Sequence, residues 1–79
     1  MDKDEFCGLI RKHGDTQKTL ADALGLALST VNAKINGTNG AEFTQTEIDF
    51  IADRYNMTAD EIVVVFFPRR VSKKDTPES

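Results

Sequence analysis

Two glycines, Gly25 and Gly37, constrain the fold of this chain more than any other feature, because each follows a short run of helical apolar spacing. Ahead of each glycine, apolar residues recur three and four positions apart, as one buried helix face requires. A glycine placed directly after such a run supplies the positive φ that ends a helix. The sequence therefore predicts one short helix that Gln17 opens and a second helix over 28–36, separated by a tight turn.

The two predicted helices need to approach each other closely. Ala21 offers a small side chain at the expected crossing point, and Leu26 is expected to fill the corner between the helices. Val31 and Ile35 lie four residues apart and form the predicted inward stripe of the second helix. The opposite side of that helix is left free for another role.

This segment resembles the helix-turn-helix of the Cro and phage-repressor family, also called the xenobiotic-response-element family. The resemblance implies an all-α, five-helix, lambda-repressor-like DNA-binding domain with the helix-turn-helix at its second and third helices. Two positions depart from the family pattern, since Ala27 stands where a polar cap is usual and Leu28 where a polar base-reading residue is frequent. The matching positions are Thr16, Gln17, Leu20, Ala21, Leu24, Gly25, Leu26, Ser29, Thr30, Val31, Asn36 and Gly37.

Local signals predict the remaining helices. A first helix over 2–13 has Asp2 and Glu5 as a capping pair, Gly14 follows it, and Thr16 can cap the next helix. Further along, two capping boxes, each with a hydrophobic staple, predict helices that begin after a threonine. The boxes are Thr44 with Glu47 and Thr58 with Glu61, and the staples are Phe43 with Ile48 and Met57 with Ile62.

The run from 62 to 67 gives conflicting signals. Its β-branched and aromatic residues favour a strand by propensity, whereas the capping box upstream favours a helix. We expect a short helix to about Val65, with Phe66 and Phe67 extended before Pro68. The chain is then divided into a helix-turn-helix domain over 1–67 and a flexible polar tail over 68–79.

Charge and composition limit the possible partners. The net charge of −3 and the pI near 5.0 count against DNA binding, although basic residues gather in the first half and the tail. No apolar run approaches the roughly 20 residues that span a bilayer, and the first residues, MDKDEF, lack a signal-peptide plan. A single cysteine excludes an internal disulfide. We therefore expect a cytoplasmic protein without membrane contact.

The predicted function places the helix over 28–36 in the major groove of double-stranded DNA. Asn32 can pair with adenine, and Leu28 and Ala33 can contact thymine methyl groups. Gln17 can hold a phosphate at the start of the preceding helix. The complete set of expected DNA contacts is Gln17, Lys18, Leu28, Ser29, Thr30, Asn32, Ala33, Lys34, Asn36 and Asn39.

Several of these residues have simpler roles open to them. Asn36 can equally end its helix ahead of Gly37, Leu28 can be a core or interface residue, and Thr30 can support the start of its helix. Phe66 and Phe67 are expected to form a homodimer surface, since a small domain buries one of them and exposes the other; packing of both rings within the protomer is the alternative.

Other chemistry finds little support in the sequence. His13 and Cys7 are the only residues of their kinds and cannot build a metal site without carboxylates. There is no phosphate-binding glycine loop and no acid–base carboxylate pair. We expect no enzyme, no cofactor and no small-molecule substrate. The predicted function is a phage or prophage-type repressor that binds an operator; the alternative is a helix-turn-helix scaffold that binds protein, as an antirepressor or antitoxin-like module.

Overall fold

The computed structural model describes residues 1–68, and within them every regular element is a helix. The elements are α1 (Lys3–Lys12), α2 (Gln17–Leu24), α3 (Leu28–Asn36), the short 3-10 helix η1 (Thr38–Gly40), α4 (Gln45–Arg54) and α5 (Ala59–Phe66). The predicted all-α class is confirmed for this part of the chain. None of these helices has the length and apolar character needed to cross a membrane. Apart from Pro68, the predicted tail lies outside the described residues.

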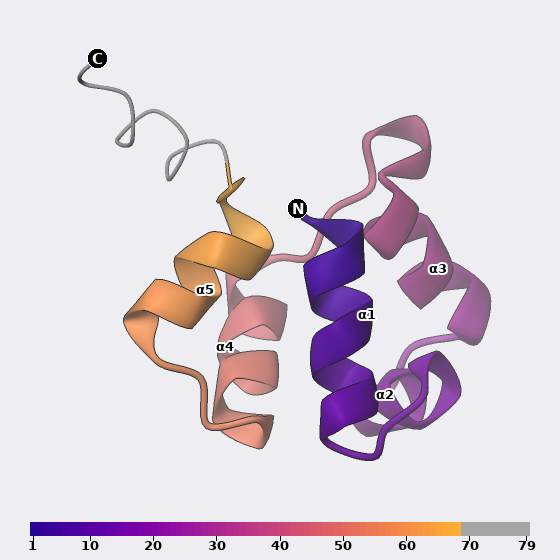
Figure 1. Cartoon of the computed structure of the whole chain (residues 1–79). Coiled ribbons are helices and arrows are strands. Elements are labelled where there is room, and N and C mark those ends of the chain that lie inside the picture. The colour runs from indigo at the N-terminus through magenta and orange to yellow at the C-terminus, as the bar shows by residue number, and fades with distance from the viewer. Residues whose placement is uncertain (69–79) are drawn as a thin grey trace.

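The first helix is the centre of the arrangement. In Figure 1, α1 stands in the middle, with α5 and α4 on one side of it and α2 and α3 on the other. The backbone N–H of Asp2 donates to the carbonyl of Val65 at 2.8 Å, so the start of α1 is fixed to the last turn of α5. The two helices that are farthest apart in the sequence are therefore neighbours in space.

All five α-helices contribute to one apolar core. Its least exposed large side chains are Phe6, Leu20, Val31 and Ile51. Phe6 is the hub of an aromatic cluster, because its ring centroid lies 5.5 Å from that of Phe43 and 5.9 Å from that of Phe66. At these spacings aromatic rings add attraction beyond simple burial.

Side-chain caps begin four of the five α-helices. Asp2 accepts a hydrogen bond from the amide of Glu5 at 3.1 Å, and the predicted boxes of Thr44 and Thr58 are both present. Thr16 also caps its helix, in a box with Thr19. These capping predictions are confirmed. The exception is α3, whose capping position holds Ala27 and has no side-chain hydrogen bond.

The end of α5 differs from the prediction. Phe66 is the last helical residue and only 6% exposed, and the chain leaves the helix at Phe67, where φ is −133°. The expectation of an extended Phe66 is wrong because its ring packs against Phe6 and Phe43, and such packing overrides local β-propensity. Phe66 is therefore also unavailable for the expected dimer surface. The most exposed large apolar residue of α5 is Val64.

Candidate nucleic-acid interface

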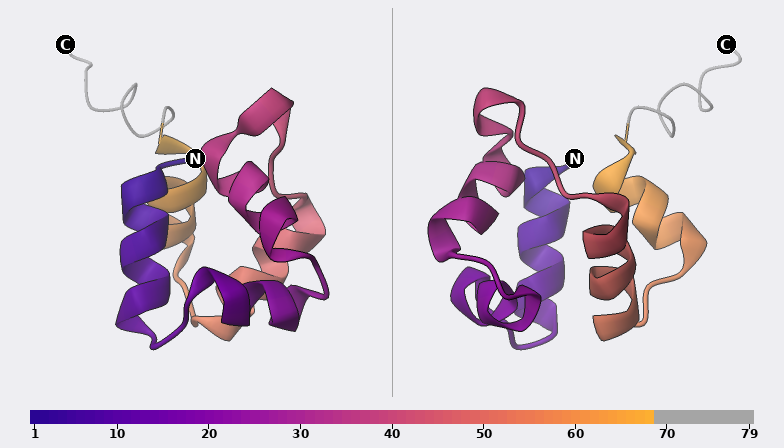
Figure 2. Two further views of the ribbon diagram at one scale, coloured as in Figure 1. Left: turned by 90° about the vertical axis from the view of Figure 1, so that its right-hand side faces the viewer. Right: turned by 180° about the vertical axis from the view of Figure 1, so that it is seen from behind.

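A three-residue connection joins α2 to α3 and fixes their geometry. Gly25 adopts the left-handed conformation, with φ +74° and ψ 27°. The amides of Gly25 and Leu26 donate to the carbonyls of Asp22 and Ala21 at 3.2 and 2.9 Å, which is the hydrogen-bond pattern of a Schellman motif. Leu26 then packs against the core. As a result α3 leaves α2 at a steep angle, as Figure 2 shows in its left view.

The third helix has one buried face and one open face. Val31 and Ile35 are 0% and 4% exposed and hold the helix against the core. Residues on the open face are short or polar, except for Leu28, which is 41% exposed. That exposure excludes a core role for Leu28. The other exposed residues of α3 are Ser29, Asn32 and Asn36, and the half-buried ones are Thr30, Ala33 and Lys34.

The polar groups on this face differ in their availability. Within the described residues, no hydrogen bond engages the side chains of Asn32 and Ser29. The side chain of Asn36 instead donates to the carbonyl of Asn32 at 3.0 Å, one turn back in the same helix. The side-chain amide of Asn36 is therefore already hydrogen-bonded within α3. Gly37 ends the helix with φ +70°.

Lys34 is directed into the protein. Its Nζ lies 2.8 Å from Oε1 of Glu47 and 3.2 Å from the carbonyl oxygen of Glu42, and its side chain is only 15% exposed. The ammonium also lies 5.8 Å from the centroid of the Phe43 ring. Burial acts to raise the pKa of Glu47, but the hydrogen bonds from Lys34 and from the amide of Thr44 outweigh it, so this pKa lies below its ordinary value. Lys34 thus fastens α3 to α4.

The remaining predicted contacts lie around α3. Gln17 is the first residue of α2 and is half-buried, and Asn39 is exposed in η1 with φ +53°. Lys18 pairs with Asp22 at 3.0 Å, but both side chains are 64% exposed. An ion pair with that exposure contributes little and exchanges readily with solvent or another anion.

Asp15 forms a polar cluster that the sequence reasoning did not find. Its carboxylate accepts hydrogen bonds from Arg54 at 2.8 and 3.0 Å, from the Tyr55 hydroxyl at 2.6 Å and from the Thr19 hydroxyl at 2.9 Å. His13 stacks on the Tyr55 ring with centroids 4.8 Å apart. The cluster ties the connection between α1 and α2 to the end of α4, and so braces the base of α2.

The hydrogen bonds in this cluster change its titration. Those from Arg54 and Tyr55 hold the pKa of Asp15 well below its ordinary range. Burial, together with the neighbouring carboxylate, raises the pKa of Tyr55. Asp15 and Arg54 lie far apart in the sequence, so no local pattern signals their contact. A polar residue beside a helix-ending glycine was the one available hint.

The described residues contain no candidate metal site, and the comparisons with known proteins identify no relative. Among residues 1–68, no group of three or more His, Cys, Asp or Glu side chains is placed to hold a metal ion. Comparison of the chain with protein-family models, with curated proteins and with solved structures found no match.

Proposed function

We propose that this protein is a sequence-specific DNA-binding regulator of the phage or prophage repressor type. In this proposal α2, the connection at Gly25 and α3 form a helix-turn-helix within a five-helix, lambda-repressor-like domain, and α3 enters the major groove. The observation that carries it is the open face of α3, with Leu28 and Asn32 exposed while Val31 and Ile35 fix the opposite face to the core. A rigid helix with a free face of short side chains suits close approach to base edges.

Asn32 is the proposed base reader. Its unengaged amide carries a donor and an acceptor, which match N6 and N7 of adenine. Leu28 and Ala33 lie on either side of it along the helix and offer apolar surface to thymine methyl groups. The proposed operator therefore contains A·T pairs opposite the centre of α3.

Phosphate contacts come from the margins of the same surface. Neutral donors supply most of them, in keeping with the acidic net charge of the chain. We assign Lys34 to positioning α3, because Glu47 and Glu42 already engage its ammonium. Asn36 remains at the edge of the surface, with its amide bound inside the helix. The proposed phosphate or sugar contacts are Gln17, Lys18, Ser29, Thr30 and Asn39.

Regulation would be steric. A two-fold homodimer sets its two recognition helices about 34 Å apart, one turn of B-DNA, over a palindromic operator. Occupation of that operator keeps polymerase or a competitor off the site. Of the expected dimer residues only Phe67, half-buried beyond the end of α5, remains near the surface.

Selection of bound sequences from a random duplex pool tests the proposal. We expect a recovered motif with two half-sites at one-turn spacing. Asn32→Ala should lose discrimination at one position of each half-site, whereas Gln17→Ala should weaken binding to all sequences alike. Thr46→Ala, which truncates an exposed neutral side chain on α4, is the matched control and should bind as the wild type does. Recovery of no enriched sequence, or wild-type behaviour of both test variants, contradicts the proposal.

The alternative, a protein-binding module on the same scaffold, makes a different prediction about salt. DNA binding through phosphates weakens as the salt concentration rises, and the logarithm of the binding constant falls linearly with that of the salt. An apolar protein interface is little affected or strengthened. An affinity that stays constant between 50 and 500 mM salt, roughly the range over which phosphate contacts are lost, would favour the protein-binding module.

A further inference from the structure

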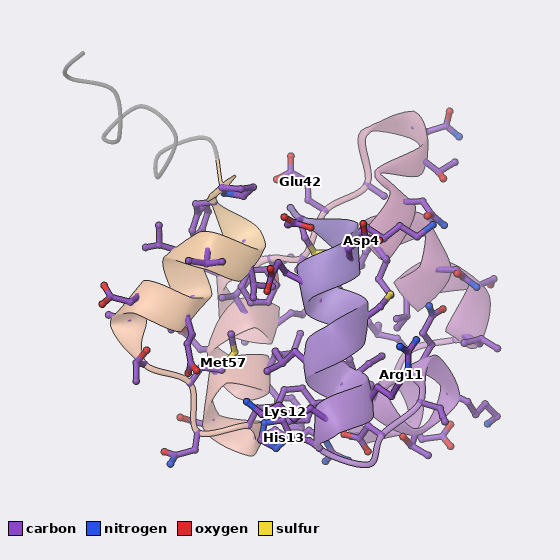
Figure 3. All side chains as sticks on the ribbon, viewed as in Figure 1. Asp4, Arg11, Lys12, His13, Glu42 and Met57 are labelled. Carbon is purple, nitrogen blue, oxygen red and sulfur yellow. The ribbon has the colours of Figure 1, made fainter. Side chains whose placement is uncertain are left out.

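A groove between α1 and α5 lies away from the α3 surface. The two helices run antiparallel, and α3 is on the other side of α1 (Figure 1). The groove has a volume of about 400 Å³. It is long enough to follow two turns of α1, from Asp4 to Lys12, which Figure 3 labels near opposite ends of that helix.

The floor of this groove is apolar and open. It is formed by Gly8 and Leu9 of α1 and by Val64 and Val65 of α5, of which Val64 is 39% exposed. Gly8 is unusual, since a glycine inside a helix costs about 1 kcal/mol relative to alanine. A Cβ built on Gly8 meets no atom within 4 Å, so no packing inside the described chain requires glycine there. What the glycine does provide is room for another segment to approach the helix closely.

Carboxylates stand at both ends of the floor. Asp4 and Glu5 lie at the end next to the last turn of α5, and Asp60 and Glu61 lie at the other. Lys12 is the one basic residue that lines the groove. Glu61 already accepts a hydrogen bond from the amide of Thr58, whereas no hydrogen bond within the described residues engages the carboxylates of Asp4 and Asp60. The groove therefore offers an apolar centre between two pairs of carboxylates, the second of which has Lys12 at the same end.

We propose that this groove binds the chain's own segment 69–74, RRVSKK, in the same molecule. The segment has two basic residues, then Val71 and Ser72, then two more basic residues, which is the charge pattern complementary to the groove. It follows Pro68, just beyond α5, whose last turn lies beside the start of α1 and so beside Asp4 and Glu5. Docking would pair Arg69 and Arg70 with those carboxylates and place the valine on the apolar floor.

The lengths are compatible with this placement. From Val64 back to Asp60 the axis of α5 rises about 6 Å, at 1.5 Å per residue. Six residues in an extended chain span up to about 20 Å. Lys73 and Lys74 therefore reach the second pair of carboxylates, Asp60 and Glu61, with length to spare for the turn after Pro68. This inference does not depend on whether α3 binds DNA.

Limited trypsin digestion of the 79-residue chain tests the docking, because trypsin cleaves after the basic residues concerned. In low salt we expect the double variant Asp4→Asn/Asp60→Asn to raise the initial rate of tail cleavage about three- to fivefold. This is the effect expected from the loss of two exposed ion pairs. The matched control is Glu42→Gln with Asp53→Asn, which changes the net charge equally outside the groove. It should leave the rate unchanged. Equal rates in wild type and both variants overturn the proposal.

A second variant tests the floor without altering charge. Gly8→Leu fills the groove and suits a helix better than glycine, so it should fold and should speed tail cleavage to a similar extent. Unchanged cleavage in this variant also contradicts docking. Tenfold dilution of the wild-type protein should not alter protection. Protection that is lost on dilution would assign the groove to the tail of a second copy and overturn the intramolecular assignment.

Discussion

Replacement of Asp15 by asparagine should be one of the most damaging conservative changes in this protein. The side chain of Asp15 is 12% exposed, and Arg54, Tyr55 and Thr19 all donate to it. A hydrogen bond to a charged group contributes about 1.5–3 kcal/mol, and an asparagine cannot accept the paired donors of a guanidinium. Allowing for the part that solvent replaces, we expect the free energy of unfolding to fall by about 3 kcal/mol.

Urea denaturation followed by circular dichroism measures this loss of unfolding free energy. Thermal unfolding gives a second measure: for a domain of this size, 1 kcal/mol corresponds to about 4–8 °C in melting temperature, so Asp15→Asn should melt about 12–24 °C lower. The matched control is Asp53→Asn, an exposed carboxylate on α4, which should stay within about 0.5 kcal/mol of the wild type. If the two variants unfold at the same urea concentration, the Asp15 cluster does not stabilise the fold as described.

The difference in the free energy of unfolding between the wild type and Asp15→Asn should depend on pH in a defined direction. The pKa of Asp15 is lower in the folded chain than its ordinary value near 4, so the unfolded chain binds the proton more tightly. The ionised cluster therefore contributes its full stability above about pH 5, and the contribution is lost progressively as the pH falls below 4. The difference in the free energy of unfolding between the wild type and Asp15→Asn should therefore decrease over that acidic range. A gap that stays constant from about pH 7 to pH 2 would refute the electrostatic account.

Two further changes bear on α3. Ala27→Ser should supply the cap that α3 lacks and raise the free energy of unfolding by about 0.5–1.5 kcal/mol, measured by urea denaturation, with no gain if the serine hydroxyl stays in solvent. Lys34→Met should lower it by about 1–2 kcal/mol, because the half-buried carboxylate of Glu47 loses its partner. The slope of DNA affinity against salt should stay unchanged in Lys34→Met; a slope reduced by about one would instead make Lys34 a phosphate contact.

Local chemistry made most of the helices predictable from the sequence. A capping box lies within four residues, so the helix starts at Thr44 and Thr58 can be predicted without knowledge of the fold. A helix-ending glycine acts at its own position, so the same holds for the helix ends at Gly25 and Gly37. The bounds 28–36 predicted for the helix before Gly37 agree with those of α3. Its open face follows from the spacing of two buried residues alone.

What the sequence did not reveal depends on contacts between distant elements. Lys34 looks like a surface residue of α3 until α4 brings Glu47 beside it, and Phe66 looks like a strand residue until the core supplies partners for its ring. Asp15 likewise meets Arg54 only once α4 is in place. The prediction for Phe66 was wrong because tertiary packing outweighed a local preference, and the contacts of Lys34 and Asp15 likewise depend on packing that no local pattern shows.

The adjacency of the first and last described helices also bears on biosynthesis. Phe6 leaves the ribosome about sixty residues before Phe66 and the carbonyl of Val65, which hold the start of α1. Domains generally fold as units during synthesis, and contacts of such long sequence separation form late. A nascent chain stalled after α4 should therefore remain sensitive to proteases, and protection should appear only when α5 has cleared the exit tunnel.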